Sequence, residues 1–213
     1  IWEKPRYEQA RQCAEKGLLD QAIPELIKIT RLYPDSMEAH AYLGWAYSQK
    51  GLISDAAEEF QTVQKIDPGF VMAYWGEAMS YNHPLWQEQD YDKGNAVLTA
   101  LAPSATERIA KAKTKLEKDF IDGINILYGK GNKAERDSSY AMHMESLYKK
   151  YPRNDEVAAF YSLALNGWGT TEKDISILEK AAGIGHEIVQ RNPKHPGALH
   201  YIIHALDNPK HAA

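Results

Sequence analysis

Two neighbouring stretches of this sequence match each other at a constant offset of 34 residues, and this repeat limits the possible folds more than any other feature. Residues 12–36 read QCAEKGLLDQAIPELIKITRLYPDS, and residues 46–70 read AYSQKGLISDAAEEFQTVQKIDPGF. The aligned positions are Gly17 with Gly51, Ala22 with Ala56, Leu26 with Phe60 and Pro34 with Pro68. Each stretch predicts two amphipathic helices joined at the glycine, with a proline where the second helix ends. Such a unit buries its apolar face only against its neighbours, so we expect an all-α fold of stacked helix pairs.

The second repeat resembles the tetratricopeptide repeat (TPR) family. That family usually has Trp at position 4 of its repeat, Leu-Gly at 7–8, Tyr at 11, Ala at 20, Phe or Tyr at 24 and Pro at 32. Counted from Met37, this sequence has His40, Leu43–Gly44, Tyr47, Ala56, Phe60 and Pro68 at those positions, so that only His40 departs from the pattern. The resemblance implies a right-handed superhelical solenoid of antiparallel helix pairs.

The later repeats are predicted to be degenerate, within a single TPR-like helical domain over residues 1–213. The predicted units are 3–36, 37–70, 71–103, 107–152 and 156–193, followed at 195–206 by the first helix of a further unit. The segment NHPLWQEQD interrupts the third unit at 82–90, and one long charged helix is predicted over about 107–128. Because the last unit lacks a second helix, we expect the natural protein to continue past Ala213 or a partner to cover this end.

The composition excludes some classes of partner. The net charge is −4 and the pI is about 6.1, which leaves no basic footprint for nucleic acid. No apolar run reaches the ~20 residues of a bilayer crossing, so we expect no membrane insertion. The sequence begins with Ile1 rather than Met, which indicates a trimmed N-terminus and leaves a periplasmic or secreted location open for a soluble protein. The sequence does not indicate the oligomeric state.

The resemblance implies a concave groove, lined by the first helices of the repeats, in which TPR proteins bind peptides. The matching positions here are rich in aromatic and methionine side chains, which make an adaptable surface. The predicted partner-binding residues are Tyr7, Arg11, Trp45, Gln49, Met72, Trp75, Met79, Asn82 and His83. The first prediction of function is therefore an interaction scaffold that binds a protein or peptide. The alternative is that insertions such as 82–90 fold back and bury these aromatic rings.

Histidines are concentrated near the end of the sequence. Residues 195–213 hold four of the eight histidines in the chain, and His200 and His204 stand four residues apart on one predicted helix face. Two imidazoles so placed suit one transition metal. The second prediction of function is therefore metal binding by His200, His204, Asp207 and His211, with Glu77 behind the ligands or acting as a base.

The repeat register offers a structural explanation for the same residues. It places Glu77 and His200 at position 7 and His204 at position 11, where the family packs apolar side chains inward. Buried polar groups need hydrogen-bond partners, so the alternative is a polar seam in which each imidazole bonds a tyrosine hydroxyl or a backbone carbonyl. The segments at 73–90 and 195–212 also resemble a group of mostly bacterial TPR proteins of undetermined function, and that resemblance names no activity.

Other catalytic motifs are missing from the sequence. GKGNK at 129–133 lacks the spacing of a phosphate-binding loop, and no serine or cysteine nucleophile motif is present. The balance is against an enzyme. No cofactor is expected, with a transition metal as the alternative.

Overall fold

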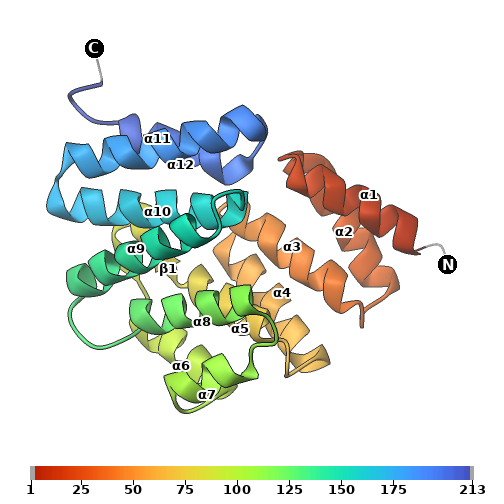
Figure 1. Cartoon of the computed structure of the whole chain (residues 1–213). Coiled ribbons are helices and arrows are strands. Elements are labelled where there is room, and N and C mark those ends of the chain that lie inside the picture. Colours follow the sequence, from red (N-terminus) through yellow and green to blue (C-terminus); the bar gives the residue numbers. More distant parts are fainter. Residues whose placement is uncertain (1–2, 212–213) are drawn as a thin grey trace. The chain divides into compact units, whose positions relative to one another are not determined.

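The computed structural model describes residues 3–211, and these residues form twelve α-helices and one two-stranded sheet (Figure 1). The all-α class predicted from the repeat is confirmed. The chain divides into two compact units, whose described residues are 3–81 with 91–121, and 82–90 with 122–211. None of the helices in the described part of the chain combines the length and the apolarity that crossing a bilayer requires.

The first unit is a series of helices in which each helix from α1 to α6 packs on the next. Its helices are α1 (Glu3–Glu15), α2 (Leu19–Leu32), α3 (Met37–Gln49), α4 (Ile53–Ile66), α5 (Val71–Ser80), α6 (Tyr91–Leu101), α7 (Ala105–Lys111) and the start of α8 (Lys115–Leu127). In addition α1 contacts α3, and α3 contacts α5, so the first helices of successive repeats lie side by side. This is the arrangement that the 34-residue offset predicted.

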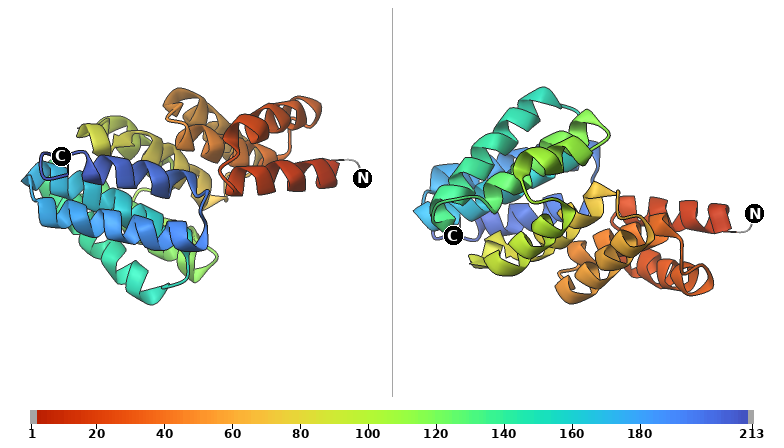
Figure 2. Two further views of the ribbon diagram at one scale, coloured as in Figure 1. Left: turned by 90° about the horizontal axis from the view of Figure 1, so that it is seen from above. Right: turned by 90° about the horizontal axis from the view of Figure 1, so that it is seen from below.

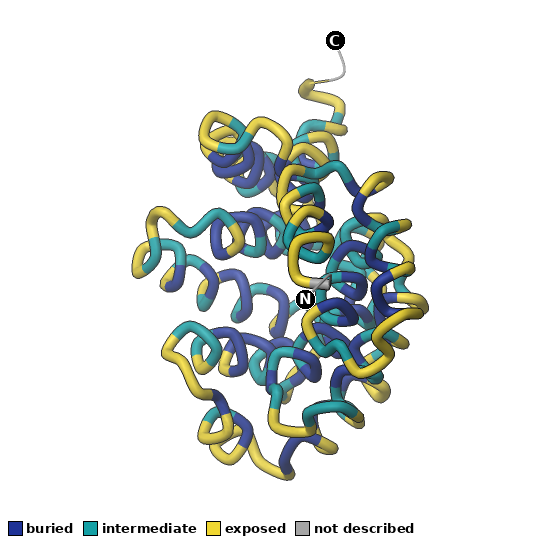
Figure 3. The backbone as a smooth tube through the Cα atoms, turned by 90° about the vertical axis from the view of Figure 1, so that its right-hand side faces the viewer, coloured by how far each residue is buried: buried dark blue, intermediate teal, exposed yellow. Residues whose placement is uncertain are grey.

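The repeated glycines and alanines explain why the helix pairs close so tightly. Gly17 and Gly51 have φ angles of 71° and 72°, a left-handed conformation that a glycine adopts without steric cost at the end of a helix. Ala22 and Ala56 are fully buried where the two helices of a pair meet. Figure 3 shows that buried residues alternate with exposed ones along the helices, as the amphipathic pattern requires.

The single long helix predicted over 107–128 is wrong, because the structure has two helices there, α7 and α8. Local hydrogen bonds separate α7 from α8. The Glu117 carboxylate accepts the backbone N–H groups of Lys113 and Thr114, and the Thr114 hydroxyl accepts the N–H of Glu117. This reciprocal cap starts a new helix at Lys115 and outweighs the continuous helical pattern.

The second unit contains the end of α8 and four further helices. They are α9 (Lys133–Lys150), α10 (Asp155–Glu172), α11 (Ile175–Arg191) and α12 (Pro196–Leu206). From α9 onward each helix packs on the next, and α10 also contacts α12 (Figure 2).

The insertion at 82–90 belongs to this second unit and has its own structure. It forms a short hairpin of β1 (Asn82–His83), the 3₁₀ turn η1 (Pro84–Trp86) and β2 (Glu88–Gln89), and η1 packs on α10. The Gln87 side-chain amide donates to the Gly167 carbonyl oxygen at 3.0 Å. Pro84 comes so close to Gly167 that an added Cβ there would stand 2.7 Å from the proline Cβ. A glycine in α10 therefore makes room for the insertion.

Candidate functional site

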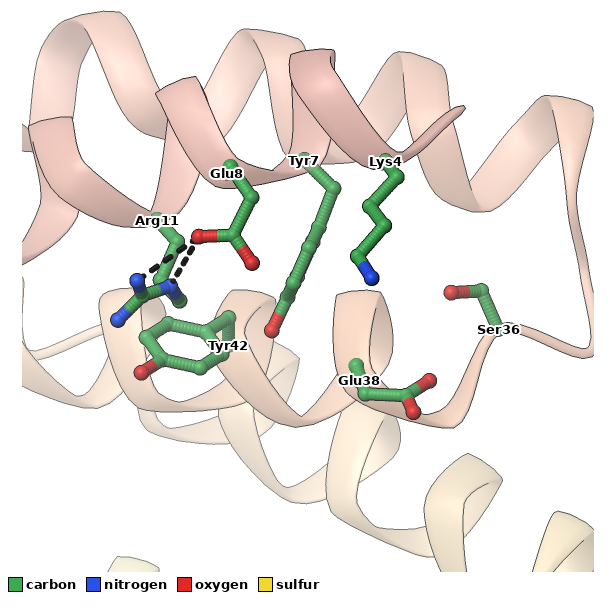
Figure 4. Close-up of a pocket in the computed structure, with 7 residues that line it drawn as sticks. All are labelled: Lys4, Tyr7, Glu8, Arg11, Ser36, Glu38 and Tyr42. Carbon is green, nitrogen blue, oxygen red and sulfur yellow. Dashed lines mark hydrogen bonds and ion pairs between the residues drawn. The ribbon is translucent and has the colours of Figure 1, made fainter. Parts of the chain in front are cut away.

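An open pocket of about 560 Å³ lies between α1 and α3 in the first unit (Figure 4). The two helices that form its walls are the first helices of repeats one and two. The residues that line it are Lys4, Tyr7, Glu8, Arg11, Ser36, Glu38 and Tyr42.

Three aromatic rings form a continuous row beside this pocket. The rings of Tyr7 and Tyr42 meet edge to face with centroids 5.9 Å apart, and those of Tyr42 and Trp45 with centroids 6.2 Å apart. Tyr42 and Trp45 are three residues apart on α3, which places them on one face of the helix. All three side chains are half-buried, so each keeps part of its ring accessible while the rest packs on the core of α1–α3.

The charged groups of the pocket fall into two kinds. Arg11 is held in place, because it donates to Glu8 at 2.8 Å and to Glu15 at 2.5 Å, and the hydrogen bonds to Glu8 are the main reason why its pKa is raised. Lys4 and Glu38 project into the pocket from opposite walls (Figure 4), and neither forms an ion pair with another described side chain. Within the described residues, the pocket therefore offers one free cation and one free anion beside an ordered arginine.

Burial is the main cause that raises the pKa of both pocket tyrosines, Tyr7 and Tyr42. Their hydroxyls therefore stay protonated at neutral pH. The Tyr42 hydroxyl donates to Glu15 at 3.0 Å, which links the aromatic row to the Arg11 ion pairs. The wall formed by these groups is thus fixed before any ligand arrives.

The C-terminal histidines make a second candidate site, on α12 in the second unit. The Nε2 atoms of His200 and His204 lie 2.9 Å apart, and the Trp86 ring lies edge-on to His204 with centroids 5.8 Å apart. The other two predicted ligands are placed differently. His211 bonds Glu179 at 3.1 Å, and Asp207 directly follows Leu206, the last residue of α12. Within residues 3–211, no group of three or more His, Cys, Asp or Glu side chains is arranged to hold one metal ion. The four-ligand site stays a prediction.

The inward positions predicted for His200 and His204 are wrong. His200 is exposed and His204 is half-buried, and the apolar side chains of Leu199 and Ile203 on the same helix are 43% and 66% exposed. His200 occupies position 7, which becomes buried only when another helix packs over it. No described helix follows α12 to do so.

Glu77 in the first unit is buried as its register predicted, with 4% of its surface exposed. Its two carboxylate oxygens accept the side-chain amides of Gln61 at 2.7 Å and Gln64 at 2.6 Å, and the Tyr81 hydroxyl donates to the first oxygen at 3.4 Å. Both glutamines come from α4, so Glu77 joins α5 to α4. The polar-seam explanation therefore accounts for this residue.

Comparisons with known proteins bear mainly on the fold. No protein-family model matches the chain. Among solved structures, the crystal structure of TTC0263, a thermophilic TPR protein in Thermus thermophilus, superposes with a TM-score of 0.59 and 16% identity over 96% of this chain and 98% of that one. The chain has the fold of a TPR protein.

Two curated sequences are also similar over part of the chain. They are cellulose synthase operon protein C of Escherichia coli strain K12 and putative cellulose synthase operon protein C of E. coli O157:H7, each 31% identical over 102 residues. The match covers 47% of this chain and 9% of each relative, so the chain spans less than a tenth of their length.

Seven of the nine predicted partner-binding residues lie on α1, α3 and α5. They are Tyr7 and Arg11 on α1, Trp45 and Gln49 on α3, and Met72, Trp75 and Met79 on α5, and all are half-buried. Only Tyr7 and Arg11 line the pocket. Trp75 instead packs edge-on against Phe120 of α8, with ring centroids 5.2 Å apart.

The remaining two predicted residues, Asn82 and His83, form β1 in the second unit. Asn82 is buried and accepts the Gln89 side-chain amide at 3.2 Å across the hairpin. Tyr42 lines the pocket but was not among the predicted partner-binding residues. Its spacing from Trp45 was the signal that could have placed it beside the pocket.

Proposed function

We propose that this chain is an interaction scaffold that binds an extended peptide segment of a partner protein in the pocket between α1 and α3. The observation that carries the proposal is the row of Tyr7, Tyr42 and Trp45 beside an open pocket. Partly exposed, pre-ordered aromatic rings supply contact area at a low cost in conformational entropy. The TPR fold supports the proposal, because stacked repeats present extended surfaces for binding.

The charges of the pocket suggest the kind of peptide that fits. Lys4 and Arg11 balance Glu8 and Glu38, so the lining has no net charge to select a strongly acidic or basic ligand. Arg11 is already paired, which leaves Lys4 and Glu38 for polar groups of the peptide. We infer that aromatic or aliphatic side chains provide most of the binding free energy and that the two free charges set direction along the groove.

The first prediction is that Trp45→Ala and Tyr42→Ala each weaken peptide binding by about tenfold or more, because each removes part of the aromatic row. A phage-displayed random peptide library selected on the full chain supplies the ligands, and fluorescence anisotropy measures their dissociation constants. Tyr33→Ala is the matched control, since Tyr33 is 39% exposed and lies outside the pocket.

Circular dichroism and thermal unfolding establish that each variant is folded before binding is compared. Selected peptides that bind the Trp45 and Tyr42 variants as tightly as the unmodified chain would refute this pocket as the binding site. Loss of binding in the Tyr33 variant as well would point to another surface.

A further inference from the structure

His200 and His204 differ from other histidines of this chain in what they face. Four histidines have a carboxylate oxygen within 4.0 Å, and the pairs are His40 with Glu59, His143 with Asp122, His195 with Glu156 and His211 with Glu179. His200 and His204 face each other instead, Nε2 to Nε2, and neither has a carboxylate within that distance among the described residues.

In this arrangement the Nε2 atoms of His200 and His204, both of which can ligate a metal, are joined by a single hydrogen bond. One ring donates its Nε2–H and the other accepts it at its Nε2 lone pair, across 2.9 Å. A divalent cation can bond both nitrogens once the ring that carries Nε2–H takes the tautomer protonated on Nδ1, so that both rings stay neutral and both Nε2 lone pairs are available.

The separation of the two nitrogens favours a particular class of metal. With metal–nitrogen bonds of about 2.0 Å, nitrogens 2.9 Å apart subtend an angle of about 90° at the metal. That angle belongs to the tetragonal geometry of Cu²⁺ or Ni²⁺, whereas tetrahedral Zn²⁺ prefers a wider one. Affinity for imidazole ligands also rises to a maximum at Cu²⁺ among the first-row divalent ions.

We propose that His200 and His204 form a two-histidine site for a divalent transition-metal cation, with Cu²⁺ as the preferred ion. The site lies on the exposed side of α12, beside the ring of Trp86, which is itself 62% exposed. Two protein ligands leave the other coordination positions to water or to a ligand atom from outside. The site is independent of the peptide pocket, which lies in the other unit.

The test titrates CuCl₂, NiCl₂ and ZnCl₂ into the full chain and follows tryptophan emission and heat. We expect one saturable Cu²⁺ site that quenches emission, with Ni²⁺ and Zn²⁺ binding more weakly. His200→Ala and His204→Ala each weaken Cu²⁺ binding by about tenfold or more, because a single imidazole loses the chelate. Trp86→Phe retains the heat of binding but loses most of the quenching, since Trp86 is the indole beside His204.

His186→Ala is the matched control, because His186 is a single exposed histidine on the neighbouring helix α11, and it leaves the Cu²⁺ isotherm unchanged. His200 is exposed and His204 is half-buried, so neither substitution removes a core side chain and the helical signal in circular dichroism survives both. Cu²⁺ binding that is equal in the unmodified chain and in the His200 and His204 variants overturns the proposal. Tighter binding of Zn²⁺ than of Cu²⁺ overturns the tetragonal assignment. Peptide binding to the α1–α3 pocket is measured separately, so either result stands without the other.

Discussion

At the scale of single residues, Glu77 shows how this chain buries a carboxylate without a cation. Two glutamine amides from α4 supply its hydrogen bonds, one for each oxygen. A buried charge is costly unless it is hydrogen-bonded, and hydrogen bonds to charged groups are stronger than neutral ones. Glu77 therefore joins α5 to α4 at a position where TPR repeats usually place an apolar side chain.

Replacing Glu77 by alanine removes the carboxylate that accepts the half-buried amides of Gln61 and Gln64, although Gln64 keeps the Ala73 carbonyl oxygen at 3.4 Å. We expect Glu77→Ala to lower the free energy of unfolding by about 1–2 kcal/mol, toward the low end of the roughly 1–3 kcal/mol that a buried donor costs when it is left unpaired. Urea denaturation followed by circular dichroism measures the change. Glu58→Ala on the exposed face of α4 is the control and should stay within about 0.5 kcal/mol of the unmodified chain. A Glu77 variant as stable as the control would show that water satisfies the two glutamines.

The sequence predicted residue positions well where the spacing along one helix decides them. The facing of His200 and His204 follows from their four-residue separation on α12. The place of His211 could not be predicted, because it depends on where the chain turns after Leu206 and on Glu179 in α11. The exposure of His200 follows from the predicted lack of a second helix in the last unit, because no described helix follows α12 to cover that position.

At the scale of elements, the helix pairs with strong repeat signals were predictable and the insertion at 82–90 was not. Helix α6, at Tyr91–Leu101, lies within the unit predicted at 71–103. The hairpin formed by the insertion depends on α10, whose Gly167 lies 80 residues from Gln87 in sequence. The residue pattern within 82–90 cannot predict a contact with a residue so distant in sequence. The only sequence signal for a break within 107–128 was the pair Thr114 and Glu117, which can cap a new helix. That signal is weaker than the helical periodicity of the whole stretch.

Gly167 and Gly183 provide a matched pair of helix glycines that tests the packing of the insertion. A Cβ at Gly167 would stand 2.7 Å from Pro84, whereas a Cβ at Gly183 would meet nothing within 4 Å. We expect Gly167→Ala to destabilise the chain by about 1–3 kcal/mol through overpacking. Gly183→Ala should stabilise it by about 0.5–1 kcal/mol through helix propensity.

Denaturant unfolding measures both free energies, and hydrogen exchange locates the change. Amide exchange within 82–90 should become faster in the Gly167 variant, because Pro84 and its turn are pushed from α10. Equal stabilisation by both alanines would show that the insertion is not closely packed on the helix.

At the scale of the whole molecule, both units depend on tyrosines that are partly or wholly withdrawn from water. Eight tyrosines of the described chain have a raised pKa, four in each unit. Burial is the main cause for seven of them, and for Tyr148 the main cause is its hydrogen bond to Glu187, which raises the pKa to about 12. The eight are Tyr7, Tyr42, Tyr47, Tyr74, Tyr140, Tyr148, Tyr161 and Tyr201.

These shifts predict how stability changes in alkali. A tyrosine whose pKa is higher in the folded chain than in the unfolded chain favours folding below its unfolded pKa of about 10. As the pH rises above about 10, the unfolded chain loses these protons first, so the free energy of unfolding falls. We expect helical content to be retained up to about pH 10 and to be lost above it in both units.

Tyrosinate absorbance and circular dichroism, recorded on the same samples, measure the two processes together. The eight tyrosines should ionise in step with the loss of helix rather than before it, because only unfolding exposes their hydroxyls fully to water. Substituting Tyr140 by phenylalanine should reduce this alkaline sensitivity, since Tyr140 is buried and its hydroxyl has no hydrogen-bond partner among residues 3–211. Complete tyrosine ionisation with a midpoint near pH 10 and an unchanged helical signal would contradict the burial of these rings.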